Sequence, residues 1–331
     1  MIKNKTKIPV EKKETLKSTR DGFGQGMVEL AEKNSQVVAL CADLTESLRL
    51  NKFAEKYPER FIQVGIAEQN MIGVAAGLAI RGKIPFAASF AVFSPGRTWE
   101  QIRDSVCYSD LPVIIVGGHT GLNVGEDGYT QQGLEDLALM RVLPNMTIVS
   151  PVDFEETRKA VHALSVLGKP AYLRLTRKKS LSITDKNTPF EIGKANVIKN
   201  GNDITIIGSG PILAEAIKAT KNIDNSISIE IINLHTIKPL DISTIIKSLQ
   251  KTKAFITIEE HQLMGGVYSA ILESLANDKN GGKLVALPHK ALGLKDSFGE
   301  SGKAVELWKK HNLDSSSIEK TIQTVLEWKN D

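Results

Sequence analysis

The sequence predicts an α/β protein made of two doubly wound domains. Its 331 residues exceed the usual size of one domain. Short runs of apolar and β-branched residues alternate with helical segments, and most of these runs lack the two-residue alternation of a half-exposed strand. Continuous apolar strands separated by helices are typical of a mainly parallel sheet covered on both faces. The alternation occurs twice, with a polar stretch between the two regions.

The first region contains expected strands bounded by Gly, Pro, Asp or Asn, at 37–41, 61–64, 84–88, 113–116, 147–149 and 171–175. Helices are expected between them at 48–57, 69–80, 98–105 and 154–164. The helix at 69–80 is apolar on almost every side, so we expect it to be buried in a core or against another subunit. Gly73 and Gly77 lie on one side of this helix and favour close packing at an interface.

A polar connector after Arg177 divides the chain. Residues 181–202 are expected to be a linker with at most a short strand at 195–198. The first domain is then 15–180, and the smaller second domain is 203–331. Its expected strands are 204–207, 227–232, 254–258 and 283–287, and its expected helices are 212–220, 267–277 and 318–328. Residues 1–14 are rich in lysine and are expected to form a flexible, solvated tail.

Composition argues against nucleic-acid and membrane functions. The formal net charge is +4, and no basic cluster is interleaved with aromatic residues as single-strand binding requires. The longest apolar run, 71–80, is too short to span a bilayer, and no apolar core follows the N-terminal charges as in a signal peptide. We therefore expect a cytoplasmic protein. Cys41 and Cys107 are isolated in apolar surroundings and are expected to be buried free thiols.

Glu68 lies where a strand ends and the apolar helix begins. A Glu at this position can simply offset the helix dipole. Because the helix has almost no polar face, however, we expect the carboxyl group to be partly buried, where it can donate a proton or pair with a ring nitrogen. Phe90 and Phe93 follow the next strand, and they are either core residues or a flat wall for a heteroaromatic ring.

A long polar segment, 119–132, leaves the carboxyl end of the strand at 113–116. Open α/β sheets bind ligands at that edge, and the segment concentrates Gly, His, Asp, Glu and Gln. We expect it to be a binding site. Four anion-ready groups could each be ordinary surface residues, but together they would suit a phosphate: Arg20, Ser47, His119 and Arg177.

Four motifs occur in the order and approximate spacing of the transketolase pyrimidine-binding domain. They are Asp43-Leu44-Thr45, Gly65-Ile66-Ala67-Glu68-Gln69-Asn70, Gly125-Glu126-Asp127-Gly128 and Leu175-Thr176-Arg177. The region after Asp203 is similar to the transketolase C-terminal domain, with weaker motifs. From about Arg20 onward, the chain therefore resembles the C-terminal half of a transketolase. This resemblance implies a thiamine diphosphate cofactor and ketol transfer between sugar phosphates, as in the pentose phosphate pathway.

The resemblance implies cofactor contacts for five residues. Glu68 corresponds to the glutamate that hydrogen-bonds N1′ of the aminopyrimidine, which helps to remove the thiazolium C2 proton. Phe90 and Phe93 match the aromatic wall around the pyrimidine. Asp43 and Leu44 match residues in supporting positions near the cofactor.

The resemblance also implies substrate contacts. Asp127 matches the aspartate that reads the hydroxyl configuration of the sugar, and the four anion-ready groups fall where the family binds the sugar phosphate. Gln131 replaces the His of a Thr-His-Gln sequence, so it can hold a donor hydroxyl but cannot titrate near neutrality. Gly96 stands where an aromatic residue often extends the pyrimidine wall, which predicts a more open pocket.

The family holds the cofactor diphosphate through a metal ion in an N-terminal domain marked by Gly-Asp-Gly, and this sequence has no Gly-Asp-Gly. The resemblance therefore implies a separate N-terminal polypeptide that holds Mg²⁺ or Ca²⁺, with no metal ligands in this chain. The expected assembly is an α2β2 heterotetramer in which this chain also self-associates and each active site lies at a subunit junction.

Three alternatives stay open. They are an enzyme like 1-deoxy-xylulose-5-phosphate synthase, a beta-type subunit of a 2-oxo-acid dehydrogenase, and a non-catalytic regulatory subunit. A free half chain argues against the first, and the Gly-Glu-Asp-Gly loop with the phosphate set argues against the second. Because Glu68, Phe90, Phe93 and Asp127 are all present, loss of catalysis is not visible in the sequence. Fold analogy alone does not decide between these functions.

Overall fold

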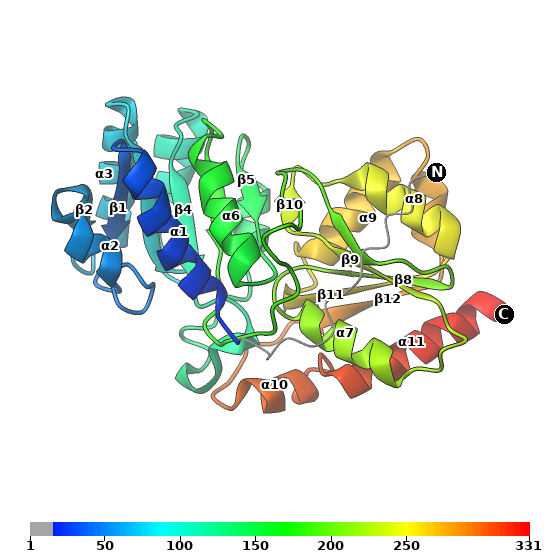
Figure 1. Cartoon of the computed structure of the whole chain (residues 1–331). Coiled ribbons are helices and arrows are strands. Elements are labelled where there is room, and N and C mark those ends of the chain that lie inside the picture. The colour runs from blue at the N-terminus through cyan, green and yellow to red at the C-terminus, as the bar shows by residue number, and fades with distance from the viewer. Residues whose placement is uncertain (1–15) are drawn as a thin grey trace.

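The computed structural model describes residues 16–331, so the tail expected at 1–14 lies outside the described residues. The chain forms two α/β units, on the left and right of Figure 1, and each has a mainly parallel sheet between helices. The predicted fold class is therefore confirmed. Within residues 16–331, no helix combines the length and apolarity that crossing a bilayer requires.

The first sheet has seven strands, and all strands but β10 run parallel. In spatial order they are β10 (Thr236–Lys238), β5 (Thr147–Val149), β6 (Ala171–Arg174), β4 (Ile114–Gly118), β3 (Ile84–Phe90), β1 (Val37–Cys41) and β2 (Phe61–Gln63). Every strand expected in the first region is present. β10 was not expected from the sequence; it belongs to the second half of the chain and pairs antiparallel with β5. Figure 1 shows β10 beside β5 at the junction of the two units.

Helices cover both faces of the first sheet. α1 (Thr19–Lys33) packs on α6 (Phe154–Ser165) over one face, and α3 (Glu68–Ile80) covers the other. A capping box of Ser18 and Asp21 starts α1, and the Asp153 side chain caps α6. The shorter elements are α2 (Asn51–Lys56), η1 (Pro58–Arg60), α4 (Trp99–Gln101), the π-helix η2 (Ile102–Tyr108), η3 (Leu122–Asp127) and α5 (Asp136–Arg141). The helix expected at 98–105 is thus one α turn that continues as a π-helix.

One face of α3 is open. Met71 and Ile72 are buried in the core, but Gly73, Gly77 and Ile80 are exposed. A Cβ atom added at either glycine would meet no atom within 4 Å. The structure therefore excludes complete burial of this helix in the core of the chain, and contact of the open face with another subunit stays a prediction.

The second sheet has five strands. In spatial order they are β12 (His289–Leu294), β11 (Phe255–Gln262), β8 (Ile204–Gly208), β9 (Ile229–Asn233) and β7 (Asn196–Lys199), of which β7 runs antiparallel to β9. The helices around it are α7 (Leu213–Asn222), α8 (Ile242–Thr252), α9 (Val267–Asn277), α10 (Ala304–Lys310) and α11 (Ser315–Asn330). α7 and α11 pack together on one face, and α8 and α9 lie on the other (Figure 1).

The prediction of a strand at 283–287 is wrong. Those residues form the 3₁₀ helix η4 (Gly282–Ala286), which turns Leu284 into the core beside α9. The last strand, β12, begins after Pro288, whose carbonyl accepts the N–H of Phe255. Proline has no N–H for a strand ladder and is tolerated mainly at strand beginnings and edges. The apolar run before it is therefore not a strand.

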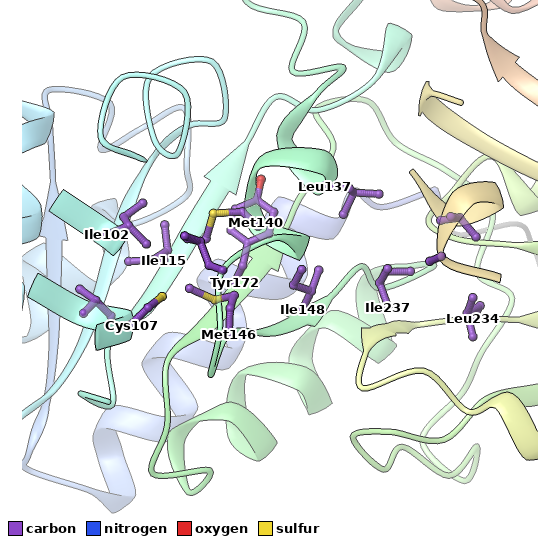
Figure 2. Close-up of a cluster of buried hydrophobic side chains, with 14 of the residues drawn as sticks. Ile102, Cys107, Ile115, Leu137, Met140, Met146, Ile148, Tyr172, Leu234 and Ile237 are labelled. Carbon is purple, nitrogen blue, oxygen red and sulfur yellow. The ribbon is translucent and has the colours of Figure 1, made fainter. Parts of the chain in front are cut away.

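The two units share a hydrophobic core. One cluster of buried side chains runs from the first sheet across the junction to the second, and Figure 2 shows part of it between Ile102 and Leu234. Tyr172, Ile148 and Ile237 lie in its middle. Cys41 and Cys107 are buried free thiols, as predicted.

Candidate functional site

The predicted site residues lie at one edge of the first sheet. Most of them follow or end a parallel strand on its carboxyl side: Asp43 after β1, Glu68 after β2, Phe90 at the end of β3, His119 after β4 and Arg177 after β6, whereas Arg20 lies near the start of α1. The carboxyl ends of parallel strands meet at the same edge, which is where open α/β sheets bind ligands. The topology therefore collects residues that are far apart in the sequence.

Glu68 is the first residue of α3 and is only 3% exposed. Its Oε2 atom lies 3.0 Å from Nη1 of Arg97. The Arg97 guanidinium also lies over the Phe93 ring, 4.8 Å from the ring centroid. The planar Arg97 cation thus contacts the Glu68 carboxylate and the face of the Phe93 ring at the same time. Sequence reasoning did not find Arg97, although it follows Phe93 by one helical turn's spacing.

Three rings form a continuous wall beside Glu68. Phe90 and Phe93 are stacked with centroids 5.9 Å apart, and the His119 ring stacks on Phe90 at 3.6 Å. Gly96 adds no ring to this wall, because a Cβ atom there would lie 2.2 Å from the Val92 carbonyl oxygen. The turn after Phe93 thus excludes any side chain at this position, aromatic or not.

His119 connects the aromatic wall to a cluster of positive charge. It is buried, and its Nδ1 has no hydrogen-bond partner within the described part of the chain. Burial, together with the charges of Arg20 and Arg177, lowers the pKa of His119 to about 3. The imidazole is therefore neutral near pH 7 and can hydrogen-bond an anion but not pair with it as a cation.

The positive cluster contains Arg20, Arg49 and Arg177. Arg20 donates from Nη1 to the Ser47 carbonyl oxygen at 2.8 Å, and its Nε is buried without a partner among residues 16–331. Burial, and then the charge of Arg49, lowers the pKa of Arg20. Like charges gathered in this way favour binding of an anion. Arg49 was missed, although it follows Ser47 by two residues in the same turn.

The loop after β4 brings Asp127 to this cluster. Asp127 is at the end of η3, and its Oδ1 lies 3.3 Å from Nη2 of Arg177. Arg177 also donates from Nη1 to the Val124 carbonyl oxygen at 2.7 Å. Gln131 is half-buried in the same loop and accepts a hydrogen bond from the Thr130 hydroxyl group. A carboxylate that can accept from a hydroxyl group therefore stands beside guanidinium groups that can bind a phosphate.

Asp43 and Leu44 lie in a turn next to the site. Asp43 is exposed in the left-handed region (φ 59°), and its N–H donates to Oε1 of Gln63 at 2.7 Å. The N–H of Gly65 donates to the same oxygen at 3.3 Å, so Gln63 joins this turn to the one before Glu68. Leu44 is half-buried against the core cluster that contains Phe90. Both residues thus lie beside this edge of the sheet, and their supporting role near the cofactor stays a prediction.

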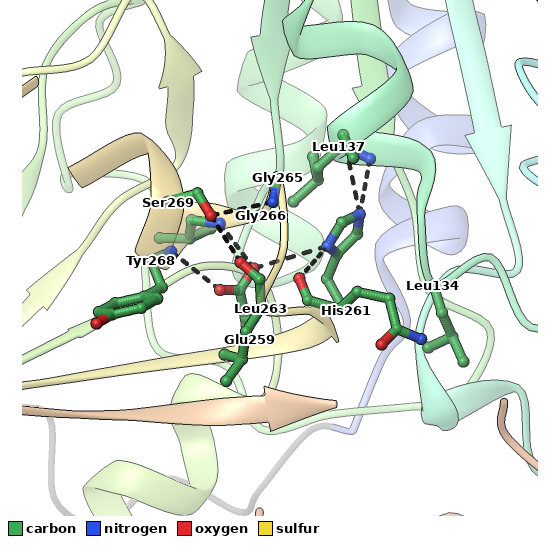
Figure 3. Close-up of polar contacts among 12 residues, drawn as sticks. Leu134, Leu137, Glu259, His261, Leu263, Gly265, Gly266, Tyr268 and Ser269 are labelled. Carbon is green, nitrogen blue, oxygen red and sulfur yellow. Dashed lines mark hydrogen bonds and ion pairs between the residues drawn. The ribbon is translucent and has the colours of Figure 1, made fainter. Parts of the chain in front are cut away.

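The end of β11 forms a polar junction that sequence reasoning missed. His261 accepts hydrogen bonds at Nε2 from the N–H groups of Leu137 and Ala138, and the N–H of Gln262 donates to the Leu134 carbonyl oxygen at 2.8 Å (Figure 3). The buried Arg174 donates to both carboxylate oxygens of Asp136 and also to the Glu260 carbonyl oxygen. The signal was present, because an apolar strand that ends in Glu-Glu-His-Gln has polar side chains at its carboxyl end.

The structure offers no evident metal site. Among residues 16–331, no group of three or more His, Cys, Asp or Glu side chains is arranged to hold a metal ion.

Comparisons with known proteins agree with this architecture. The transketolase pyrimidine-binding domain family matches residues 16–181, and the transketolase C-terminal domain family matches residues 193–318. The chain is 43% identical over 310 residues to a protein of Methanocaldococcus jannaschii named as a transketolase C-terminal section, covering 92% of this chain and 95% of that protein. It is 38% identical over 312 residues to the 6-deoxy-6-sulfo-D-fructose transketolase subunit SqwH of Clostridium sp. (strain MSTE9), covering 94% and 95%.

A solved structure shows the same likeness. A split gene transketolase, described as an inactive beta4 tetramer, is 39% identical with a TM-score of 0.86, and the match covers 94% of this chain and 99% of that chain. The same family is indicated by the domain matches, by the relatives and by the fold. The chain therefore belongs to the transketolase family, whose members depend on thiamine diphosphate, and it is the C-terminal section of a split enzyme of that family.

Proposed function

We propose that this chain is the C-terminal subunit of a transketolase that transfers a two-carbon ketol unit from a ketose phosphate to an aldose phosphate. It would do so after assembly with a separate N-terminal polypeptide. The observation that carries the proposal is the position of the Arg97 guanidinium between Glu68 and Phe93. An aminopyrimidine is also planar and rich in nitrogen, so these residues fit that part of thiamine diphosphate.

When bound, the cofactor supplies an electron sink for breaking and forming a carbon–carbon bond. The role of this chain is to place the cofactor ring and the sugar. Phe90 and Phe93 provide the apolar face for the ring. Glu68 would hydrogen-bond a nitrogen of that ring, because its carboxyl group is buried and Arg97, its nitrogen-bearing partner among the described residues, can be replaced by the ring.

The substrate side of the proposal rests on the positive cluster. Arg20, Arg49 and Arg177 would bind the phosphate, and neutral His119 would donate a hydrogen bond to it. Asp127 would accept from a sugar hydroxyl group beside Arg177. Because SqwH is named for a sulfonated sugar, a sulfonate is the first alternative to phosphate to test here.

The assembly remains the expected α2β2 heterotetramer. The N-terminal polypeptide would hold the cofactor diphosphate through Mg²⁺ or Ca²⁺, as the family organisation suggests. A homologous split transketolase in beta4 form is described as inactive, which supports a requirement for the other half.

Ketol transfer should therefore appear only when this chain is mixed with the N-terminal polypeptide. This chain, the N-terminal polypeptide and their mixture are each assayed with thiamine diphosphate, Mg²⁺, ribose 5-phosphate and one donor. Xylulose 5-phosphate, 6-deoxy-6-sulfo-fructose and pyruvate are the donors compared. We expect transfer by the mixture with xylulose 5-phosphate. Activity of the lone chain would refute the split site, and turnover of pyruvate alone would favour a different reaction of the same fold.

A further inference from the structure

The loop that carries Asp127 packs against the second domain on one side. Figure 1 shows α10 beneath the junction of the two units, and α10 packs against η3 of this loop. Gln132 donates from Nε2 to the Glu300 carbonyl oxygen at 3.0 Å. A Cβ atom at Gly128, where φ is 78°, would lie 2.5 Å from Oγ of Ser301. The segment before α10 therefore lies directly against the loop.

Glu260 is the centre of this contact. It is 2% exposed, and its Oε1 accepts the Asn123 N–H at 2.8 Å and the Trp308 indole N–H at 2.6 Å. Asn123 belongs to the loop and Trp308 to α10, so a single carboxylate oxygen joins the loop, β11 and α10. Gly121 permits this approach, because a Cβ atom there would lie 2.8 Å from that of Glu260.

From Asn123 the contacts continue to the substrate residues. The Asn123 side-chain oxygen accepts the N–H of Lys178 at 2.6 Å, next to Arg177. Arg177 in turn donates to the Val124 carbonyl oxygen at 2.7 Å and pairs with Asp127 at 3.3 Å. A shift of the loop at Asn123 would therefore displace Arg177 and Asp127 together.

We propose that Glu260 is a positioning residue for sugar recognition, through which the second domain fixes the loop that carries Asp127 and supports Arg177. The identity of the recognised ligand as a sugar phosphate rests on the proposed function. The anchoring of the loop by Glu260 does not depend on the proposed function. Groups that contact a reacting molecule act best when other parts of the fold hold them in place beforehand, and Glu260 provides that support from a separate domain.

Glu259 offers a matched control. It is the neighbouring residue on β11 and is equally buried, but its carboxylate accepts the N–H groups of Val267 and Tyr268 within its own domain (Figure 3). Glu260→Ala and Glu259→Ala each remove one buried carboxylate from the same strand. A general loss of stability would affect both variants, whereas loss of the loop anchor would affect Glu260→Ala alone.

Hydrogen exchange of the full chain tests the anchor directly. Loss of a hydrogen bond to a buried carboxyl group should speed exchange of the amides in 121–128 by about tenfold in Glu260→Ala. Glu259→Ala should leave these amides unchanged. Glu260→Gln keeps an acceptor oxygen and should behave like the parent chain, and Trp308→Phe should show a smaller increase. Equal exchange in Glu260→Ala and the parent, or an equal increase in both alanine variants, would overturn the proposal.

Kinetics of the assembly with the N-terminal polypeptide test the consequence. In Glu260→Ala, KM for xylulose 5-phosphate should rise about tenfold while the Kd of thiamine diphosphate, measured by calorimetry, stays the same. An unchanged KM, or an equal rise in Glu259→Ala, would count against Glu260. If the parent assembly transfers no ketol unit, the proposed function fails, whereas the exchange comparison still decides whether Glu260 anchors the loop.

Discussion

The carboxyl edges of the two sheets differ in what lies against them. In the first sheet, this edge presents Glu68, the ring wall and the arginine cluster, and several of these groups are half-exposed or lack partners within the described residues. In the second sheet, the same edge faces the first domain and its polar groups bind there. Asn233 at the end of β9 donates to Glu156, and the end of β11 contacts α5 and the loop after β4.

The comparison shows that a fold alone does not determine a binding site. Both sheets offer the crevice that open α/β proteins use for ligands. The first leaves it available, and the second fills it with another domain of its own chain. Four changes test this contrast between an edge whose polar groups are available to a ligand and an edge whose polar groups bind the other domain.

The largest effect is expected at the first edge. Glu68→Gln removes a carboxylate that we place against the cofactor ring, so kcat of the assembled enzyme should fall by about 10²–10⁴. Stability should change little, because the pairing residue Arg97 is half-exposed and can be solvated. Glu100→Gln, at an exposed position nearby, is the control. Nearly intact turnover in Glu68→Gln would remove the main support for the proposed enzyme.

At the junction of the two domains, a substitution should mainly lower the free energy of unfolding. Arg174→Met leaves the buried Asp136 carboxylate without its bidentate partner. Removing one member of a buried pair costs about 3–5 kcal/mol in the free energy of unfolding, measured by urea denaturation. Arg103→Met breaks an exposed pair with Asp104 and should cost less than about 1 kcal/mol. Similar losses in the two variants would show that the junction is not held by this pair.

Buried carboxyl groups at the junction should make stability depend on pH. Burial, and then Asp153, raises the pKa of Glu156 from 4.5 to about 8, and burial raises those of Glu259 and Glu260 to about 7. Each folded-state pKa lies above the unfolded value, so the chain releases these protons on unfolding. Stability should therefore fall as pH rises from about 4.5 to 8, by up to about 1.4 kcal/mol per pH unit for each group. Urea denaturation of Glu156→Gln should give a flatter profile, and parallel profiles for variant and parent would contradict this assignment.

The smallest effect is expected at Gln131. Gln131→His introduces a group that titrates near pH 6.5 into the loop beside Asp127, so the pH profile of kcat should gain a limb near that value. The change in kcat at its optimum should stay within about tenfold. An unaltered profile would place residue 131 away from the reacting hydroxyl group.

The sequence predicted more of the first edge than of the second. Glu68, Phe90, His119 and Arg177 each follow a strand that periodicity identifies, and parallel topology then brings them to one edge. Arg97 follows Phe93 by one helical turn's spacing and Glu260 lies at the polar end of an expected strand, but these patterns do not identify the side chains that they contact. Their roles depend on side chains that meet across elements far apart in the sequence, which no spacing rule reports.

Errors in the fold have similar causes. The apolar run 283–287 satisfied a strand pattern, but Pro288 placed the strand after it. β10 is three residues long and pairs with a strand of the other domain, so no local pattern marks it. For α3, only complete burial in the core of the chain is excluded: among the described residues nothing lies within 4 Å of a Cβ atom added at Gly73 or Gly77, and burial of this face against another subunit stays a prediction.

β10 also limits how the protein can be dissected. A fragment that stops within the connector, at 181–202, would contain the whole pyrimidine-binding region but would lack the antiparallel strand that borders β5. Its sheet would end in unpaired backbone groups, which favour association of exposed strands. Such a fragment should aggregate unless residues 236–238 are restored. The first domain of this chain therefore depends on a strand from the second part of the chain and should not be stable when it is separated from it.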